Sequence, residues 1–291
     1  MKYIYIFILS IGILLSCGCH SQEQPASMET KIATPVKDSV QKLSKGPIFA
    51  DEKISNLQLE DPSIPVYDHF TVAERQRRGL SVRLPKLQEY SQKKIAYLTF
   101  DDGPEDKNTP AVLDILKENG VKATFYLVGK ALDAYPDIVK RIYDEGHAVG
   151  NHTWSHDYDN LYSSPSNFIA ELERFDEKIL TIIGVRPFIT RAPGGSMGQF
   201  DESYSEALKE KGYIEHDWNV SSADAAPNDP VAKDFIDNID YQTADGRKCA
   251  IILMHSSAGH EETVKALPEI IRILKERGYS FGVVTPMTPD L

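Results

Sequence analysis

Two adjacent carboxylates, Asp101 and Asp102, end an apolar run that begins at Ile95, and Gly103 and Pro104 follow them. Because glycine and proline end strands, we expect both aspartates at the C-terminal end of a strand. Neighbouring like charges repel each other and are costly to bury, and a bound cation would remove that cost. The alternative is that the two aspartates only cap the helix that follows.

Ligands for such a cation occur further along the chain. His152 and His156 are four residues apart, just after a short strand-like segment. Two imidazoles and one carboxylate make a three-ligand zinc site that leaves one position open for water. A metal held there lowers the pKa of the water and polarises a carbonyl, and the aspartate that does not bind the metal can act as general base. Taken alone, two surface histidines would give the same spacing.

Three further polar residues follow expected strands. Arg191 comes after the fourth strand, Asp224 lies in the loop after the fifth, and His255 comes after the sixth. In a parallel barrel all these strand ends lie at one rim. There Arg191 could hold the base ionised, Asp224 could orient His255, and His255 could protonate a leaving group. A surface arginine and a core histidine remain the alternatives for Arg191 and His255.

The elements that must position these residues alternate along the chain. Short apolar runs alternate with capped amphipathic helices, which predicts an α/β fold with parallel strands. About seven units suit a distorted, incomplete (β/α) barrel, and an open doubly wound sheet is the alternative. No Gly-x-Gly-x-x-Gly follows the first strand, so nothing supports nucleotide binding. The strands are expected from Ile95 to the two aspartates and at 122–128, 147–149, 188–190, 213–220, 249–254 and 281–284.

Three helices are expected to start where a capping residue precedes a proline, at Thr109, Ser164 and Asp229. The helix after Thr109 ends at Gly120, and the one after Ser164 ends at Gly184, because glycine favours the C-terminal cap. Further helices are expected before Gly146 and at 202–211 and 264–277.

The N-terminal part of the chain differs in composition. Residues 1–16 hold a lysine and an apolar run typical of a secretion signal, too short for a comfortable membrane span. The run ends at Cys17 in a pattern resembling a lipoprotein processing site, so Cys17 is the expected lipid-modified residue; ordinary secretion or an uncleaved anchor are alternatives. Residues 17–45 are expected to form a flexible tether and 46–92 an irregular arm, with one or two helical turns at 72–78.

Charge and cysteine content narrow the function classes. The formal net charge of −11 over 291 residues makes nucleic acid and anionic surfaces poor partners. Of three cysteines, only Cys249 lies outside the signal region, so we expect no internal disulfide and a buried Cys249. The expected membrane contact is through the lipid anchor alone, and the sequence does not define an oligomeric state.

Five ordered motifs resemble those of the NodB-homology polysaccharide deacetylases, carbohydrate esterase family 4, over about residues 93–287. They are Thr99-Phe100-Asp101-Asp102, His152-Thr153-Trp154-Ser155-His156, Arg191-Ala192-Pro193-Gly194-Gly195, the stretch Trp218 to Asp224, and Leu253-Met254-His255. The resemblance implies the family's distorted (β/α) barrel and marks residues 93–291 as a catalytic domain.

The resemblance also implies roles for single residues. Asp101 would be the general base and His255 the general acid, with Arg191 and Asp224 as their partners. The metal, usually zinc with cobalt or nickel possible, would be bound by Asp102, His152 and His156. The backbone N–H after Pro193, that of Gly194, would help to hold the oxyanion, and Leu253 would line the pocket for the acetyl methyl group. Trp218 is expected in the core or in the sugar groove.

Two departures from the family pattern concern the groove. Many members carry tyrosine where this chain has Gly194, and tryptophan where it has Ala225. Both changes remove large side chains from the expected position of the sugar, so the resemblance does not define the substrate.

The expected function is metal-dependent removal of acetate from N-acetylated amino sugars of a polysaccharide, first peptidoglycan and second chitin-like chains, at the cell envelope. The alternatives are an O-acetyl xylan esterase with the same machinery and a carbohydrate-binding protein without catalysis. A zinc peptidase is disfavoured, because the chain lacks glutamate in a His-Glu-x-x-His pattern.

Overall fold

The computed structural model describes residues 46–50, 52, 54, 61–87, 89 and 93–289. Contacts between residues group Ser44–Leu291 as one compact unit. The expected signal peptide, Cys17 and the tether lie outside the described residues. In the described part of the chain, no helix is long and apolar enough to cross a membrane.

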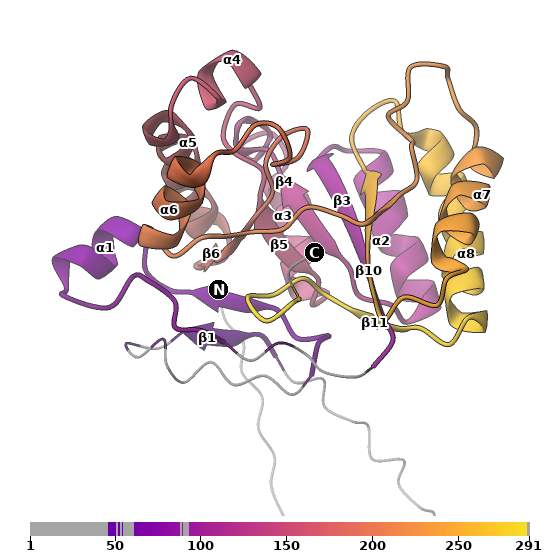
Figure 1. Cartoon of the computed structure of the whole chain (residues 1–291), viewed down its shortest axis with the longest axis horizontal. Coiled ribbons are helices and arrows are strands. Elements are labelled where there is room, and N and C mark those ends of the chain that lie inside the picture. The colour runs from indigo at the N-terminus through magenta and orange to yellow at the C-terminus, as the bar shows by residue number, and fades with distance from the viewer. Residues whose placement is uncertain are drawn as a thin grey trace, which may run out of the picture. The chain divides into compact units, whose positions relative to one another are not determined.

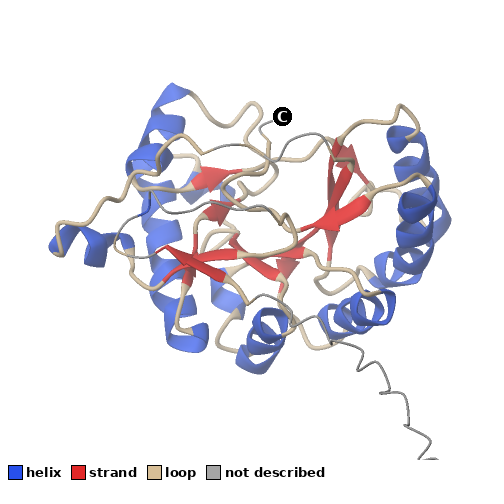
Figure 2. Cartoon of the chain, turned by 90° about the horizontal axis from the view of Figure 1, so that it is seen from below, coloured by secondary structure: helices blue, strands red, loops and turns tan. Residues whose placement is uncertain are grey.

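A curved sheet of parallel strands forms the centre of the unit (Figure 2). Seven strands follow one another in the order β8, β7, β5, β4, β3, β10 and β9, and β11 pairs with the start of β3. The incomplete (β/α) barrel expected from the sequence is therefore confirmed. The bounds are β3 Ile95–Gly103, β4 Thr124–Leu127, β5 Ala148–Asn151, β7 Ile189–Thr190, β8 Ile214–Glu215, β9 Val220–Ser221, β10 Cys249–His255 and β11 Ser280–Gly282.

Helices cover the outer face of this sheet (Figures 1 and 2). The largest apolar cluster lies between the strands and the helices and includes Leu98, Val112, Ile142, Phe175 and Ile270. The helices are α2 Asn108–Asn119, α3 Pro136–Asp144, α4 Tyr158–Leu161, α5 Pro165–Ile183, α6 Glu202–Glu210, α7 Ala232–Thr243 and α8 Glu261–Glu276, with a short 3₁₀ turn η2 at Gly129–Ala131. Ser164 caps α5 and Gly184 ends it, as expected.

The arm before the sheet is more regular than the sequence predicts. Strands β1 (Ile48–Ala50), β2 (Val66–Asp68) and β6 (Arg186–Pro187) form a second sheet, and α1 (Val72–Arg77) follows β2. These strands are too short to show a sequence period. Their strand partners and the side chain of Arg75 hold them in place. That side chain is fully buried and donates to Asp68, Ser81 and Ala50.

Three local expectations were wrong. The segment 213–220 is not one strand, because it forms β8 and β9 at opposite ends of the seven-strand order. Between them, the carbonyls of His216 and Asp217 accept hydrogen bonds from Arg191.

Two expected caps also differ. Thr109 lies inside α2, where the side chain of Glu105 accepts from the N–H groups of Asn108 and Thr109 instead. Helix α7 begins after Val231 rather than at Asp229, and the side chain of Asp234 accepts from the N–H of Val231.

Candidate active site

The register of the parallel strands brings the polar residues together. Strands β3 and β10 pair so that His255 lies beside Asp101. Strands β5 and β7 pair through Asn151 and Thr190, and the next residues along each chain are His152 and Arg191. The strand ends therefore place four residues from distant parts of the sequence at one rim, as expected of a parallel barrel.

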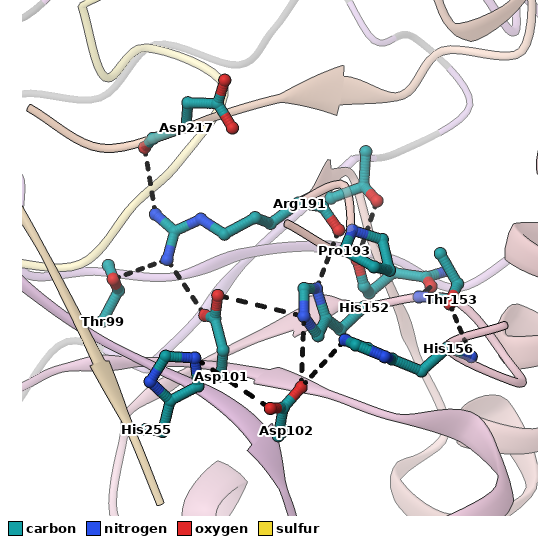
Figure 3. Close-up of polar contacts among 12 residues, drawn as sticks. Thr99, Asp101, Asp102, His152, Thr153, His156, Arg191, Pro193, Asp217 and His255 are labelled. Carbon is teal, nitrogen blue, oxygen red and sulfur yellow. Dashed lines mark hydrogen bonds and ion pairs between the residues drawn. The ribbon is translucent and has the colours of Figure 1, made fainter. Parts of the chain in front are cut away.

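The proposed metal ligands converge on one point (Figure 3). The Nε2 atom of His152 lies 3.4 Å from Asp102 Oδ1, and Nε2 of His156 lies 3.2 Å from the same oxygen. The Nδ1 atom of His152 is 2.8 Å from the carbonyl oxygen of Arg191. Because a carbonyl only accepts, Nδ1 carries the proton and the Nε2 lone pair faces the carboxylate.

This arrangement fits a divalent cation. Asp102 Oδ1 is buried and has no hydrogen bond of acceptable geometry within the described part of the chain, although two ring nitrogens lie close to it. A lone pair and a carboxylate oxygen facing each other repel unless a proton or a cation lies between them. One carboxylate and two imidazoles are a donor set that zinc binds.

The loops that carry these ligands are held in an uncommon backbone conformation. Asp102, Thr153 and His156 have φ values of 68°, 66° and 55°, in the left-handed region that non-glycine residues rarely adopt. The N–H of Thr153 donates to Asn151 Oδ1, and the N–H of His156 donates to Thr153 Oγ1. These bonds hold His152 and His156 in the orientation described above.

Asp101 lies beside the metal ligands and is paired. Its Oδ1 accepts from Nη1 of Arg191 at 3.0 Å, and its Oδ2 lies 3.9 Å from His152 Nε2. Arg191 is fully buried and also donates to Thr99 Oγ1 and to two backbone carbonyls. A guanidinium held in this way keeps the Asp101 carboxylate in one orientation.

His255 faces the cluster from the C-terminal end of β10, beside Asp101. Its Nδ1 lies 2.8 Å from Asp224 Oδ1, and its backbone N–H donates to Asp224 Oδ2 at 2.8 Å. The other ring nitrogen, Nε2, is 4.0 Å from Asp102 Oδ2. Burial would lower the pKa of His255, but Asp224, with Asp101 and Asp102, raises it to about 9. His260 stacks on this ring with centroids 4.9 Å apart.

Tyr158, which the sequence did not single out, lies where the family pattern has its missing aromatic. The side chain is 44% exposed and contacts His156 edge to face, with ring centroids 5.6 Å apart. A Cβ placed on Gly194 would lie 2.7 Å from the Tyr158 hydroxyl, and Gly194 has a φ of 75°. Tyr158 of α4 therefore occupies the space beside Gly194. A tyrosine six residues after a metal-ligand histidine was the only signal for it.

The remaining predicted residues, Pro193, Leu253 and Trp218, lie outside the cluster of proposed metal ligands. Pro193 is held by its carbonyl, which accepts from the Tyr162 hydroxyl at 2.5 Å. Leu253 lies two residues before His255 on β10, on the same face of the strand, and is 9% exposed. Trp218 is not gathered with the metal ligands. It packs on the inner apolar cluster, and its ring lies 5.7 Å from the Arg191 guanidinium carbon.

Comparisons with known proteins identify the family of this chain. The sequence model of the family described as polysaccharide deacetylase matches residues 88–215. A peptidoglycan-N-acetylglucosamine deacetylase of Bacillus cereus is 36% identical over 213 residues, which cover 72% of this chain and 76% of the relative. The peptidoglycan-N-acetylmuramic acid deacetylase PdaA of Bacillus subtilis is 32% identical over 191 residues, covering 66% and 70%.

Solved structures show the same likeness. The crystal structure of a polysaccharide deacetylase from Bacillus cereus superposes with a TM-score of 0.62 at 36% identity, covering 68% of this chain and 95% of that one. The family resemblance read from the five motifs is thus confirmed. The chain belongs to the polysaccharide deacetylase family and is a hydrolase that acts on amide bonds.

Proposed function

We propose that this protein is a metal-dependent deacetylase that hydrolyses the acetamide group of N-acetylated amino sugars in peptidoglycan. The observation that carries the proposal is the convergence of Asp102, His152 and His156 on one point, with Asp101 on one side and His255 on another. Two relatives are named as deacetylases of N-acetylglucosamine and of N-acetylmuramic acid in peptidoglycan. These names support peptidoglycan over chitin as the substrate.

Asp102, His152 and His156 would hold the metal, with zinc as the first candidate and cobalt or nickel as alternatives. A dication bound there would lower the pKa of a water molecule and polarise the acetyl carbonyl. Among the residues of the chain, Asp101 accepts the proton of the attacking water, and Arg191 keeps Asp101 aligned. Both carboxyl oxygens of Asp101 lie within 4 Å of Arg191 or His152, so the group has little freedom to turn.

His255 would donate the proton that the departing amine needs. The Asp224 carboxylate accepts from His255 Nδ1–H, which leaves Nε2 to carry the transferable proton toward the cluster. The backbone N–H of Gly194 would stabilise the negative charge on the carbonyl oxygen, and Leu253 would contact the acetyl methyl group. Tyr158 would contact the sugar ring, in place of the tyrosine that many family members carry at the position of Gly194.

A panel of acetylated glycans tests the substrate and the metal together. We expect acetate release from peptidoglycan and from N-acetylglucosamine oligomers, about one metal ion per chain, loss of activity after chelation and recovery with zinc. Release from acetylated xylan but not from the amino sugars would support the esterase alternative. No release from any glycan by metal-loaded protein would contradict the proposed hydrolase function and leave the binding-protein alternative.

The location proposed for this activity is the cell envelope, with the chain anchored through a lipid on Cys17. The apolar run before Cys17 supports this proposal. Labelled fatty acid should be incorporated into the wild-type chain and not into a Cys17→Ser variant. Equal labelling of the two would contradict the anchor.

A further inference from the structure

A second cavity adjoins the proposed oxyanion site. Its volume is about 700 Å³, and it is lined by Gly194, Gly195, Ser196, Met197 and the run Glu215–Trp218. The metal ligands, Asp101 and His255 are not among its lining residues. In Figure 3 the Asp217 carboxylate points away from Arg191, on the far side of that guanidinium from Asp101 and Asp102. The cavity is therefore a neighbour of the catalytic cluster and shares Gly194 with the site proposed for the substrate.

One wall of the cavity holds polar atoms that have no partner. Glu215 Oε1 and His216 Nε2 are buried, and neither makes a hydrogen bond to any described residue. The His216 side chain is only 3% exposed. Glu215 is thus a lining carboxyl group whose Oε1 accepts no hydrogen bond from a described residue.

The neighbouring carboxylate is already engaged. Asp217 accepts from the N–H of Ser196 at 3.0 Å and from its hydroxyl at 2.6 Å. Burial, together with Asp217, raises the pKa of Glu215 to about 8. An arriving cation would therefore be attracted by Asp217 and would favour ionisation of Glu215.

Positive side chains do not line this cavity in the described part of the chain. Arg191 is directed to Asp101, Thr99 and backbone carbonyls. Lys86 and Lys209 line an adjacent cavity that shares Glu215, and Lys209 lies 3.7 Å from Glu206. A cation brought by a ligand would thus meet negative groups and no fixed positive charge in the cavity itself.

An aromatic ring and two glycines shape the cavity. A Cβ on Gly195 would lie 3.0 Å from Trp218 Cη2 and 3.2 Å from Asp217 Oδ1, and Gly195 has a φ of 87°. Only glycine lets the loop approach the ring and the carboxylate in this way. An aromatic face beside carboxyl groups suits a sugar ring that carries a positive charge. The volume is in the range of roughly 300–1,000 Å³ found for small-molecule sites and is too large for a bare ion.

We propose that this cavity is a subsite for a glucosamine residue with a free ammonium group, next to the N-acetylated residue under attack. The inference rests on the proposed deacetylase function. The ammonium group would donate to Glu215 and be attracted by Asp217, and the sugar ring would contact Trp218. Because deacetylation itself produces such an amine, a partly deacetylated chain would be a better substrate than a fully acetylated one.

Defined oligosaccharides test this subsite. The substrates are the N-acetylglucosamine tetramer and two tetramers with one glucosamine, placed on either side of the same acetylated residue. The measured ratio is kcat/KM for a mixed tetramer divided by kcat/KM for the fully acetylated tetramer. At pH 6, where the amine is protonated, we expect this ratio to be about five to ten for one of the two mixed tetramers with the wild-type enzyme. In Glu215→Gln this ratio should fall to within twofold of one. Glu210→Gln, at the exposed end of α6, should keep the wild-type ratio.

The ratio compares two substrates on one protein, so partial loss of metal or of folded protein cancels. If Glu215→Gln fails to fold, Met197→Lys gives the same test, because Met197 is 92% exposed at the rim. A cation placed there should lower the ratio at least threefold, and Met197→Gln should keep it. Equal rates of the wild type on all tetramers, or an unchanged ratio in Glu215→Gln or Met197→Lys, would overturn the subsite. Absence of acetate release from every tetramer would instead contradict the proposed function.

Discussion

Two clusters of buried charge differ in how completely their members are paired. The arm cluster consists of Asp68, Arg75, Asp176 and Arg186, and the active-site cluster consists of Asp101, Asp102, His152, His156 and Arg191. In the arm cluster, Asp68 accepts from Arg75 at 2.5 and 3.0 Å and from Arg186 at 2.9 Å, with all three side chains fully buried. In the active-site cluster, three ligand atoms face each other with no donor between them.

The second carboxylate of the arm cluster is also engaged. Asp176 lies 3.4 Å from Arg186 and accepts from the Tyr213 hydroxyl at 2.6 Å and from the Asn151 amide at 3.2 Å. Burial raises the pKa of Asp176 to about 7. Burial of charge alone therefore does not mark a functional site. The convergence of Asp102, His152 and His156 on one point separates the active-site cluster from the arm cluster, and four experiments test this comparison.

The largest effect is expected within the active-site cluster. Asp101→Asn removes the proton acceptor but not a metal ligand, so kcat should fall about 10²–10⁴-fold while metal content stays near that of the wild type. Asp102→Ala should lose both activity and metal. Metal analysis beside acetate release checks the pair. Loss of metal in Asp101→Asn would show that the roles of the two aspartates are wrongly divided.

The next effect concerns the arm cluster. Asp68→Asn leaves Arg75 and Arg186 without their shared carboxylate, and breaking a buried pair costs about 3–5 kcal/mol of unfolding free energy. Denaturant unfolding measures the loss. Asp137→Asn is the matched control, because its partner Lys140 is 3.6 Å away at the surface, and it should cost less than about 1 kcal/mol. A change below about 1 kcal/mol in Asp68→Asn would mean that the arm cluster adds no net stability.

A buried histidine outside both clusters gives a pH test. His147 is 1% exposed, its Nδ1 accepts from the N–H of Ala123, and burial lowers its pKa to about 3. Between pH 6.5 and 3 the unfolded chain binds a proton that the folded chain does not. The contribution of His147 is therefore complete above pH 6.5 and falls with acidification by up to about 1.4 kcal/mol per pH unit.

The matched variant is His147→Asn, whose side-chain oxygen can still accept from Ala123. Its unfolding free energy should depend less steeply on pH over this window, because unfolding of the variant takes up as much as one proton less than unfolding of the wild type. Parallel curves for wild type and variant would show that His147 is protonated in the folded protein.

The smallest effect is expected at Tyr158. Loss of one aromatic contact to a sugar should raise KM about tenfold in Tyr158→Ala and leave metal content unchanged. Tyr158→Phe should stay close to the wild type, and Tyr241→Ala, an 83% exposed tyrosine of α7, is the surface control. A wild-type KM in Tyr158→Ala would remove Tyr158 from the substrate surface.

The sequence predicted the parts of the molecule whose signals are local or motif-based. Alternating strands and helices predicted the incomplete barrel, and residues at strand ends predicted the cluster around Asp102. The register of β3 with β10 then brought His255 to Asp101. The roles assigned to these residues remain predictions.

What the sequence could not predict depends on tertiary contacts. The run from Tyr213 to Val220 is expected to be one strand, yet it divides between two neighbours. Ile214 pairs with Ile189 of β7, and Val220 pairs with Ile252 of β10. Strands β1 and β2 are three residues each, too short to show a period. Tyr158 has no motif, and only its contact with Gly194 reveals that it fills the vacated space.

The shared aspartate of the arm bears on where the gene can be cut for expression. The family match starts at residue 88, but Asp68 and Arg75 come before it, and Arg186 after it. A recombinant chain that began at residue 88 would leave Asp176 as the only carboxylate of the arm cluster beside Arg186. Asp176 also accepts from the Asn151 amide. The Asn151 side chain in turn accepts from the N–H of Thr153, in the loop that follows His152. Truncation at the edge of the homology would therefore yield poorly folded protein, and a start before Ile48 is the sound choice.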